Sequence, residues 1–195
     1  MVIQPPLHFR IDEGDPRLAL WNAIRQFVKN DAQWLPAYDE VAAWLSDNQS
    51  RGLLCVGTCG LGKSVICAQA LPIVFQYFLK EVAVKVVTAT EMNQKIDELL
   101  QFCGSQRIIV VDDLGTEAVE TVTYGNRRRP FCELADMAER TGTLLIITTN
   151  LRTTRDTDPR RNYPSIQDRY GDPTLDRLRA ITKVIVFRGE SLRAT

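Results

Sequence analysis

The chain of 195 residues is 45% hydrophobic, and its 24 basic and 24 acidic side chains give a net charge of zero. This balance predicts one folded domain with a sizeable core and argues against long disordered regions. No apolar run approaches the ~20 residues of a membrane span, and no signal-peptide pattern opens the chain. The five cysteines form no Cys-x-x-Cys pair, so we expect a reduced, cytoplasmic protein with no membrane partner.

Residues 1–50 are expected to form a helical extension rather than a domain of their own. Two amphipathic patterns lie in this segment. Their apolar positions are Leu20, Ile24, Phe27 and Val28 in the first, and Val41, Trp44 and Leu45 in the second. So short a segment cannot enclose its own core, and we expect it to pack against a domain formed by residues 51–195.

The strongest motif follows the first apolar strand, expected at Leu53–Val56. It reads Gly57-Thr58-Cys59-Gly60-Leu61-Gly62-Lys63-Ser64 and precedes a helical run. The glycines of such a loop let backbone N–H groups surround phosphates, the lysine reaches the β- and γ-phosphates, and the serine hydroxyl binds Mg²⁺. The helix N-terminus adds a partial positive charge. The motif therefore predicts that all eight residues bind ATP with Mg²⁺, with Lys63 acting in catalysis and Ser64 on the metal.

Four further apolar runs are expected to be strands. They are Val82–Val87, Ile108–Val111, Leu144–Thr148 and Val184–Phe187. Nearly continuous β-branched runs are typical of parallel strands covered on both faces. A helix is predicted over Glu91–Phe102, with a capping box that begins at Thr88. Alternating strands and helices indicate an α/β fold with a five-stranded parallel sheet flanked by helices, in which ligands bind beyond the carboxyl ends of the strands.

Two acidic residues end the third strand. ATPases with a phosphate loop hold Mg²⁺ through an acid at this place, which assigns Asp112 to the metal and leaves Asp113 to orient and deprotonate the attacking water. The alternative is that one acid only caps the following turn, but two adjacent acids favour hydrolysis. Glu117 is a weaker candidate for the base, or a surface carboxylate.

The fourth strand ends in Thr148-Thr149-Asn150. An amide at this place can hydrogen-bond the γ-phosphate or the attacking water, whereas a Thr/Asn turn after a strand is also ordinary turn chemistry. The local pattern leaves both interpretations open.

Arginine-rich segments are candidates for contact with the DNA backbone. One contains Arg127, Arg128 and Arg129. The other lies in residues 152–173, expected to be a long polar loop, and contains Arg152, Arg155, Arg160 and Arg161. Guanidinium groups bind phosphate without reading sequence, although a charge run is often only a solvated face.

The charge is distributed unevenly along the chain. Residues 1–124 carry 10 basic and 15 acidic side chains, and residues 125–195 carry 14 and 9. Such an asymmetry fits a face that attracts phosphate, or copies of the chain that stack head to tail.

The ordered set of motifs resembles the AAA+ ATPases of the DnaC-type helicase-loader family and their IstB-type transposition relatives. The matching pieces are GTCGLGKS, IIVVDDLGTE, YGNRRRP, LLIITTNL, RYGDPTLDRLR and FRGESLR, over roughly residues 52–193. The resemblance implies a P-loop NTPase fold of the AAA+ type in which Asn150 senses the γ-phosphate. It also implies that Arg177 completes the active site of a neighbouring subunit. Arg179 is the second candidate for this role. Because such an arginine is worth ~10³–10⁵ in rate, an isolated subunit should hydrolyse ATP slowly.

The chain departs from the family pattern in two ways. Residues 1–50 do not obviously supply the segment with which helicase loaders grip the helicase. The sequence also stops soon after the fifth strand, so we expect no C-terminal helical lid domain and no second sensor on it.

These observations predict an AAA+ ATPase that self-associates through Arg177 on single-stranded or duplex DNA and loads or remodels a replicative helicase. The nearest alternative is a transposition helper that delivers a transposase. A small-molecule kinase and an ATP-gated interaction module are alternatives of another class. The two acids and the amide suit activated water better than an acceptor pocket.

Overall fold

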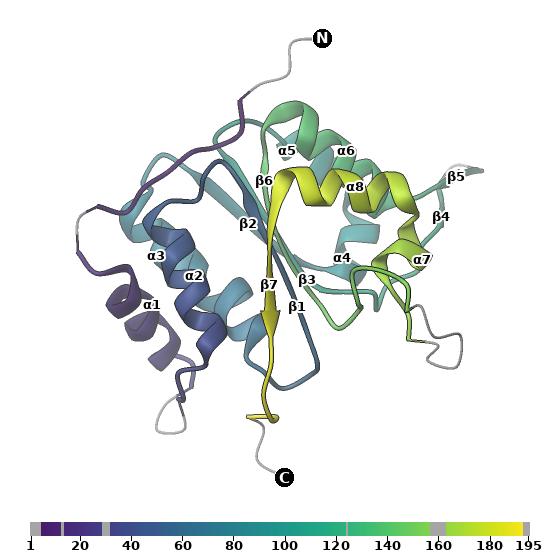
Figure 1. The fold of residues 1–195 in the computed structure, drawn as a ribbon. Helices are drawn as coiled ribbons and strands as arrows, with labels where there is room; N and C mark the ends of the chain where they lie inside the picture. Colours follow the sequence, from purple (N-terminus) through teal and green to yellow (C-terminus); the bar gives the residue numbers. More distant parts are fainter. Residues whose placement is uncertain (1–4, 13, 29–31, 124, 157–162, 193–195) are drawn as a thin grey trace.

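A parallel sheet of five strands forms the centre of the molecule (Figure 1). The computed structural model describes residues 5–12, 14–28, 32–123, 125–156 and 163–192. The strands are β1 (Gly52–Gly57), β2 (Ala83–Thr88), β3 (Arg107–Leu114), β6 (Leu144–Thr149) and β7 (Thr182–Phe187). Their order is β2-β3-β6-β1-β7, and every neighbouring pair is parallel. The five predicted strands and the α/β fold are confirmed.

Helices cover both faces of the sheet, as Figure 1 shows. One face carries α1 (Pro16–Arg25), α2 (Pro36–Ser46), the π-helix η1 (Val65–Ala70) and α3 (Leu71–Phe78). The other carries α4 (Ala89–Gln94), α5 (Ile96–Phe102), α6 (Pro130–Thr141), α7 (Ile166–Tyr170) and α8 (Asp172–Ile181). Successive residues of a strand point to opposite faces, so Leu53 and Cys55 enter the first core while Leu54 and Val56 enter the second.

The N-terminal segment packs on the first face of the sheet. Leu20, Ile24, Trp44 and Leu45 are buried in one cluster with β1, β7 and α3. The extended residues before α1 are tied to the end of α2 by Asn48, whose side chain accepts from Phe9 N at 2.9 Å and donates to Leu7 O at 2.9 Å. The division into an extension and a core domain stays a prediction.

The first predicted helix ends earlier than its apolar pattern suggested. Helix α1 stops at Arg25, so Phe27 lies beyond it and is 45% exposed. In the described part of the chain, no helix is both long and apolar enough to cross a bilayer.

The helix predicted over Glu91–Phe102 is two helices. The capping box of Thr88 and Glu91 is present, but the backbone leaves helical geometry at Lys95, with φ −114° and ψ 20°. A new helix, α5, begins after Lys95 and carries two acids in its first turn. The positive end of the helix dipole stabilises negative charge at that place. The single-helix prediction was wrong at this residue.

The long polar loop predicted over residues 152–173 was also wrong. The side chain of Ser165 caps α7 by accepting from Asp168 N at 3.0 Å. Helix α8 begins at Asp172, with proline in its first turn, a place where proline is tolerated because the N–H is not needed. The sequence carried both signals. A bridge between Arg152 and Ser165 also joins two parts of this segment to each other.

A small hairpin interrupts the second half of the fold. Strands β4 (Thr121–Thr123) and β5 (Asn126–Arg128) are antiparallel and project from the body of the molecule between β3 and α6 (Figure 1). The arginine-rich run at residues 127–129 therefore lies on this hairpin and on the start of α6, not on an open loop.

Candidate functional site

The predicted phosphate loop connects β1 to η1 at the carboxyl end of the sheet. Its glycines have the backbone angles that the motif requires, with φ +83° at Gly60 and +76° at Gly62. A Cβ at Gly60 would lie 2.1 Å from Ser191 Oγ, and one at Gly62 would lie 2.3 Å from Tyr38 Oη. Both positions therefore need glycine for its conformation and for its size.

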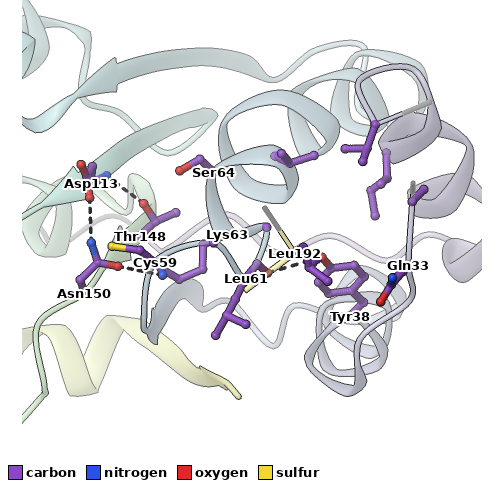
Figure 2. Close-up of a pocket in the computed structure, with 16 residues that line it drawn as sticks. Gln33, Tyr38, Cys59, Leu61, Lys63, Ser64, Asp113, Thr148, Asn150 and Leu192 are labelled. Carbon is purple, nitrogen blue, oxygen red and sulfur yellow. Dashed lines mark hydrogen bonds between the residues drawn. The ribbon is translucent and has the colours of Figure 1, made fainter. Parts of the chain in front are cut away.

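The side chain of Lys63 lies between the loop and Asn150 (Figure 2). Its ammonium donates to the carbonyls of Gly57 at 2.8 Å and Thr58 at 2.7 Å, and to Asn150 Oδ1 at 3.0 Å. Burial lowers the pKa of Lys63 below its ordinary value, because a desolvated ammonium is less favourable. The lysine of the loop and the amide after β6 are thus brought into contact, 87 residues apart in the sequence.

The two acids of β3 are held by one threonine. The hydroxyl of Thr148 donates to Asp112 Oδ1 at 2.6 Å and accepts from the backbone N–H of Asp113 at 2.8 Å. Asp113 has φ +59°, a left-handed conformation that is uncommon outside glycine. Asn150 Nδ2 donates to Asp113 Oδ1 at 3.3 Å, so Asn150 contacts both the lysine and the second acid (Figure 2).

Glu117 is not a surface carboxylate, so that interpretation was wrong. Its side chain is 1% exposed and accepts from Gly115 N at 2.8 Å and from the phenol of Tyr170. The guanidinium of Arg169 lies 3.8 Å away. Burial and the bond to Glu117 raise the pKa of Tyr170 well above its ordinary value. Glu117 joins the loop after β3 to α7, whereas Asp113 lines the pocket of the phosphate loop.

A pocket of about 370 Å³ extends from the phosphate loop toward the N-terminal helices. Its wall includes side chains that the motifs did not indicate. They are Ile24, Val28, Gln33 and Tyr38 from the N-terminal segment and Leu192 from the segment after β7. Figure 2 labels Gln33, Tyr38 and Leu192. Mostly apolar walls with a few polar groups suit the base and sugar of a nucleotide. The amphipathic pattern of α1 predicted burial but gave no indication that this face would border a ligand site.

The residues present fit a nucleotide triphosphate with Mg²⁺. The hydroxyl of Ser64 is exposed to the pocket, and Asp112 retains Oδ2 beside the Oδ1 that Thr148 binds. Hydroxyl and carboxylate oxygens are the ligands that Mg²⁺ prefers. The exposed side chain of Cys59 also lines the pocket.

Arg177 lies on α8 away from this pocket. Its guanidinium pairs with two acids of α6 in the same chain, Asp136 Oδ1 at 3.0 Å and Glu139 Oε2 at 2.7 Å. Arg179 is exposed, and no ion pair joins it to another described residue. The role of either arginine in a neighbouring site stays a prediction.

The arginines expected to contact DNA differ in their surroundings. Arg127 is exposed on β5. Arg128 pairs with Asp97 at 2.7 Å and with Glu133 at 2.5 Å, and these bonds raise its pKa above the ordinary value. Arg129 donates to the backbone carbonyl of Arg169 at 3.1 Å. Arg128 is thus an anchor of the hairpin, whereas Arg127 and Arg129 are both exposed.

The second arginine group is partly engaged within the chain. Arg152 pairs with Asp156 and stacks on the ring of Tyr163 at 4.3 Å. Arg155 pairs with Asp168. Arg160, Arg161 and Tyr124 lie outside the described residues.

Comparison with solved structures identifies the class of fold. The structure matches a DnaC helicase loader with TM-score 0.60 and 16% identity, over 87% of this chain and 98% of that one. It matches DnaI with TM-score 0.52 and 17% identity, over 94% of this chain and 87% of that one. No family model and no curated protein sequence matches the chain.

The fold is therefore that of a P-loop AAA+ ATPase domain. More narrowly, it is the fold of the DnaC helicase loader, which confirms the fold that the resemblance to DnaC-type loaders implied, while the IstB alternative stays a prediction.

Proposed function

We propose that this protein binds and hydrolyses ATP with Mg²⁺ at the pocket between the phosphate loop and the ends of β3 and β6. The observation that carries the proposal is the convergence of Lys63, Asp113 and Asn150, which come from three separate segments and are joined by hydrogen bonds. Backbone N–H groups of residues 57–64 and the ammonium of Lys63 would bind the phosphates.

Asp112 and Asp113 would have different roles, one in binding the metal and the other in accepting a proton. Ser64 and Asp112 would hold Mg²⁺, which neutralises charge that develops on the phosphate oxygens. Asp113 is exposed to the pocket and accepts a hydrogen bond only from Asn150 among the contacts above, so one carboxylate oxygen stays available to accept a proton from water. Asn150, which is bonded to both the lysine and the second acid, would sense the γ-phosphate.

The assembly that we propose is a self-associated protein on DNA that loads or remodels a replicative helicase. The fold likeness to the DnaC loader favours a helicase over a transposase as the partner. Arg177 would act on the site of the neighbouring subunit. In the single chain its guanidinium is paired with Asp136 and Glu139, so it would have to exchange these partners to reach the neighbouring site.

The test is ADP release by the purified protein over a range of protein concentrations, with and without single-stranded DNA. We expect the turnover per subunit to rise with concentration and with DNA. Arg177→Ala should abolish the rise, while the matched variant Arg179→Ala, which removes an exposed arginine of the same helix, should keep it. Turnover that is indifferent to concentration, to DNA and to Arg177 would contradict assembly and favour a self-contained kinase or an ATP-gated module.

A further inference from the structure

The segment after β7 and the helix α2 both press on the phosphate loop from outside. Leu192 N donates to Gly60 O at 2.8 Å, and the phenol of Tyr38 donates to Leu61 O at 3.4 Å. These are the two peptide units between Gly60 and Gly62, in the middle of the loop. Ser191 packs directly against Gly60, and Tyr38 packs directly against Gly62.

The direction of a carbonyl fixes the direction of the next N–H. The peptide unit is planar, and in the trans form its C=O and N–H point in opposite directions; the described residues contain no cis peptide. When Gly60 O faces Leu192, the N–H of Leu61 therefore faces away from the segment after β7. When Leu61 O faces Tyr38, the N–H of Gly62 faces away from α2.

Amides that point the same way form an anion site. Successive N–H groups around left-handed residues, here Gly60 and Gly62, make a concave nest that binds phosphate. In a free glycine-rich loop the peptide groups would sample many other orientations, and binding would cost the entropy of those orientations. Two external hydrogen bonds restrict that sampling before a ligand arrives.

We propose that Tyr38 and the backbone N–H of Leu192 are positioning groups that hold the phosphate loop ready for the phosphates of a nucleotide. The inference rests on the proposed ATP binding and gives the N-terminal segment and the terminal FRGESLR motif a part in it. Tyr38 is suited to this because burial raises its pKa to about 12, so its phenol keeps the donated proton at neutral pH. Neither group touches the reacting atoms.

The experiment separates the phosphates from the base. A fluorescent ATP analogue is bound to the protein, and tripolyphosphate, which has no base, is used as the competing ligand. Leu192→Pro removes the N–H, because proline has none, whereas Leu192→Ala keeps the N–H and removes only the side chain from the pocket wall. Tyr38→Phe removes the hydroxyl and keeps the buried ring, and Tyr77→Phe, at a residue that is 74% exposed on α3, is its matched control.

We expect Leu192→Pro to weaken tripolyphosphate binding about three- to tenfold, the range of one hydrogen bond. Tyr38→Phe should weaken it about two- to threefold because its bond is long. Leu192→Ala should weaken the ATP analogue but leave tripolyphosphate unchanged. Thermal unfolding of each variant without ligand checks the fold, and Tyr38→Phe remains decisive if the proline variant does not fold.

The outcomes distinguish this inference from the proposed function. If the wild type binds both ligands and Tyr38→Phe and any folded Leu192→Pro bind tripolyphosphate as tightly, the positioning role is refuted and the ATP site stands. If the wild type binds neither ligand, ATP binding itself is refuted, and the inference with it.

Discussion

Replacing Thr148 by valine should separate nucleotide binding from hydrolysis. The hydroxyl of Thr148 makes one bond to the carboxylate of Asp112 and one to the N–H of Asp113. A bond to a charged group contributes about 1.5–3 kcal/mol, and an N–H left without a partner costs about 1–3 kcal/mol. The left-handed backbone of Asp113 stores about 1–3 kcal/mol more and would relax once its bond is lost. If ~1.5–3 kcal/mol of this appears in the barrier, turnover falls about 10- to 100-fold.

The assay is steady-state ADP release together with the affinity for a fluorescent ATP analogue. We expect Thr148→Val to lower kcat and to leave the Kd within about threefold, since the threonine contacts the acids and not Lys63. Thr148→Ser keeps the hydroxyl and should restore most of the rate. Thr149→Val is the matched control, because that hydroxyl is also buried but donates to Leu114 O at 2.6 Å rather than to an acid. Wild-type turnover in Thr148→Val, or an equal loss in Thr149→Val, would refute the reasoning.

Three other predictions follow from the surroundings of single side chains. Glu117→Gln should lower the unfolding temperature by several degrees, because this buried carboxylate binds a phenol and a guanidinium of α7. Turnover, measured as ADP release, should stay within a few-fold of the wild type. A loss of turnover as deep as that of Asp113→Asn would make Glu117 the base. Arg127→Ala should weaken DNA binding and leave the unfolding temperature unchanged, whereas Arg128→Ala should lower that temperature because its two ion pairs anchor the hairpin. Fluorescence anisotropy with labelled DNA measures the affinity of both variants, and thermal unfolding measures their stability. A DNA affinity of Arg127→Ala equal to that of the wild type would contradict the prediction. Burial lowers the pKa of Lys63, so its charge is present below that depressed pKa and is lost as the pH rises through it. Affinity for Mg-ATP should therefore begin to fall at a lower pH than the ~10.4 of an ordinary lysine. Affinity that does not fall as the pH is raised to that value would argue against a role for this ammonium.

The sequence predicted those parts of the site that depend on short segments. Each strand end carries its own polar residues, and parallel strands bring their carboxyl ends to one edge, so a ligand site was expected at that edge. Asp112 could be assigned in the same way. The structure brings Lys63 and Asn150 into contact because β1 and β6 are neighbouring parallel strands, and the catalytic roles of both residues stay predictions.

The remaining features depend on contacts between distant segments. Tyr38 and Leu192 reach the phosphate loop only because α2 and the segment after β7 pack beside it. No local pattern distinguishes Tyr38 from another core aromatic. The acids that bind Arg177 lie on a different helix, so an arginine chosen from its motif gave no indication of them.

The hairpin β4–β5 was missed for a different reason. Its strands are three residues each, and the arginines of the second strand were interpreted as a charge run. The alternating Thr121-Val122-Thr123, followed by a turn that contains Gly125 and then by Asn126 of the second strand, was the signal that could have found it. Gly125 has φ +79° at that turn, which is the conformation such a turn requires.

Asp113 is proposed to activate water on a nucleotide held by the phosphate loop. The most direct measurement is single-turnover ADP formation from Mg-ATP by the wild type and by Asp113→Asn, with the Kd of each for Mg-ATP measured in parallel. We predict ADP formation by the wild type, a loss of about 10²–10⁴ in rate in the variant, and a Kd that changes less than about threefold. A variant that forms ADP at the wild-type rate, or a wild type that binds ATP and forms no ADP, would contradict the account.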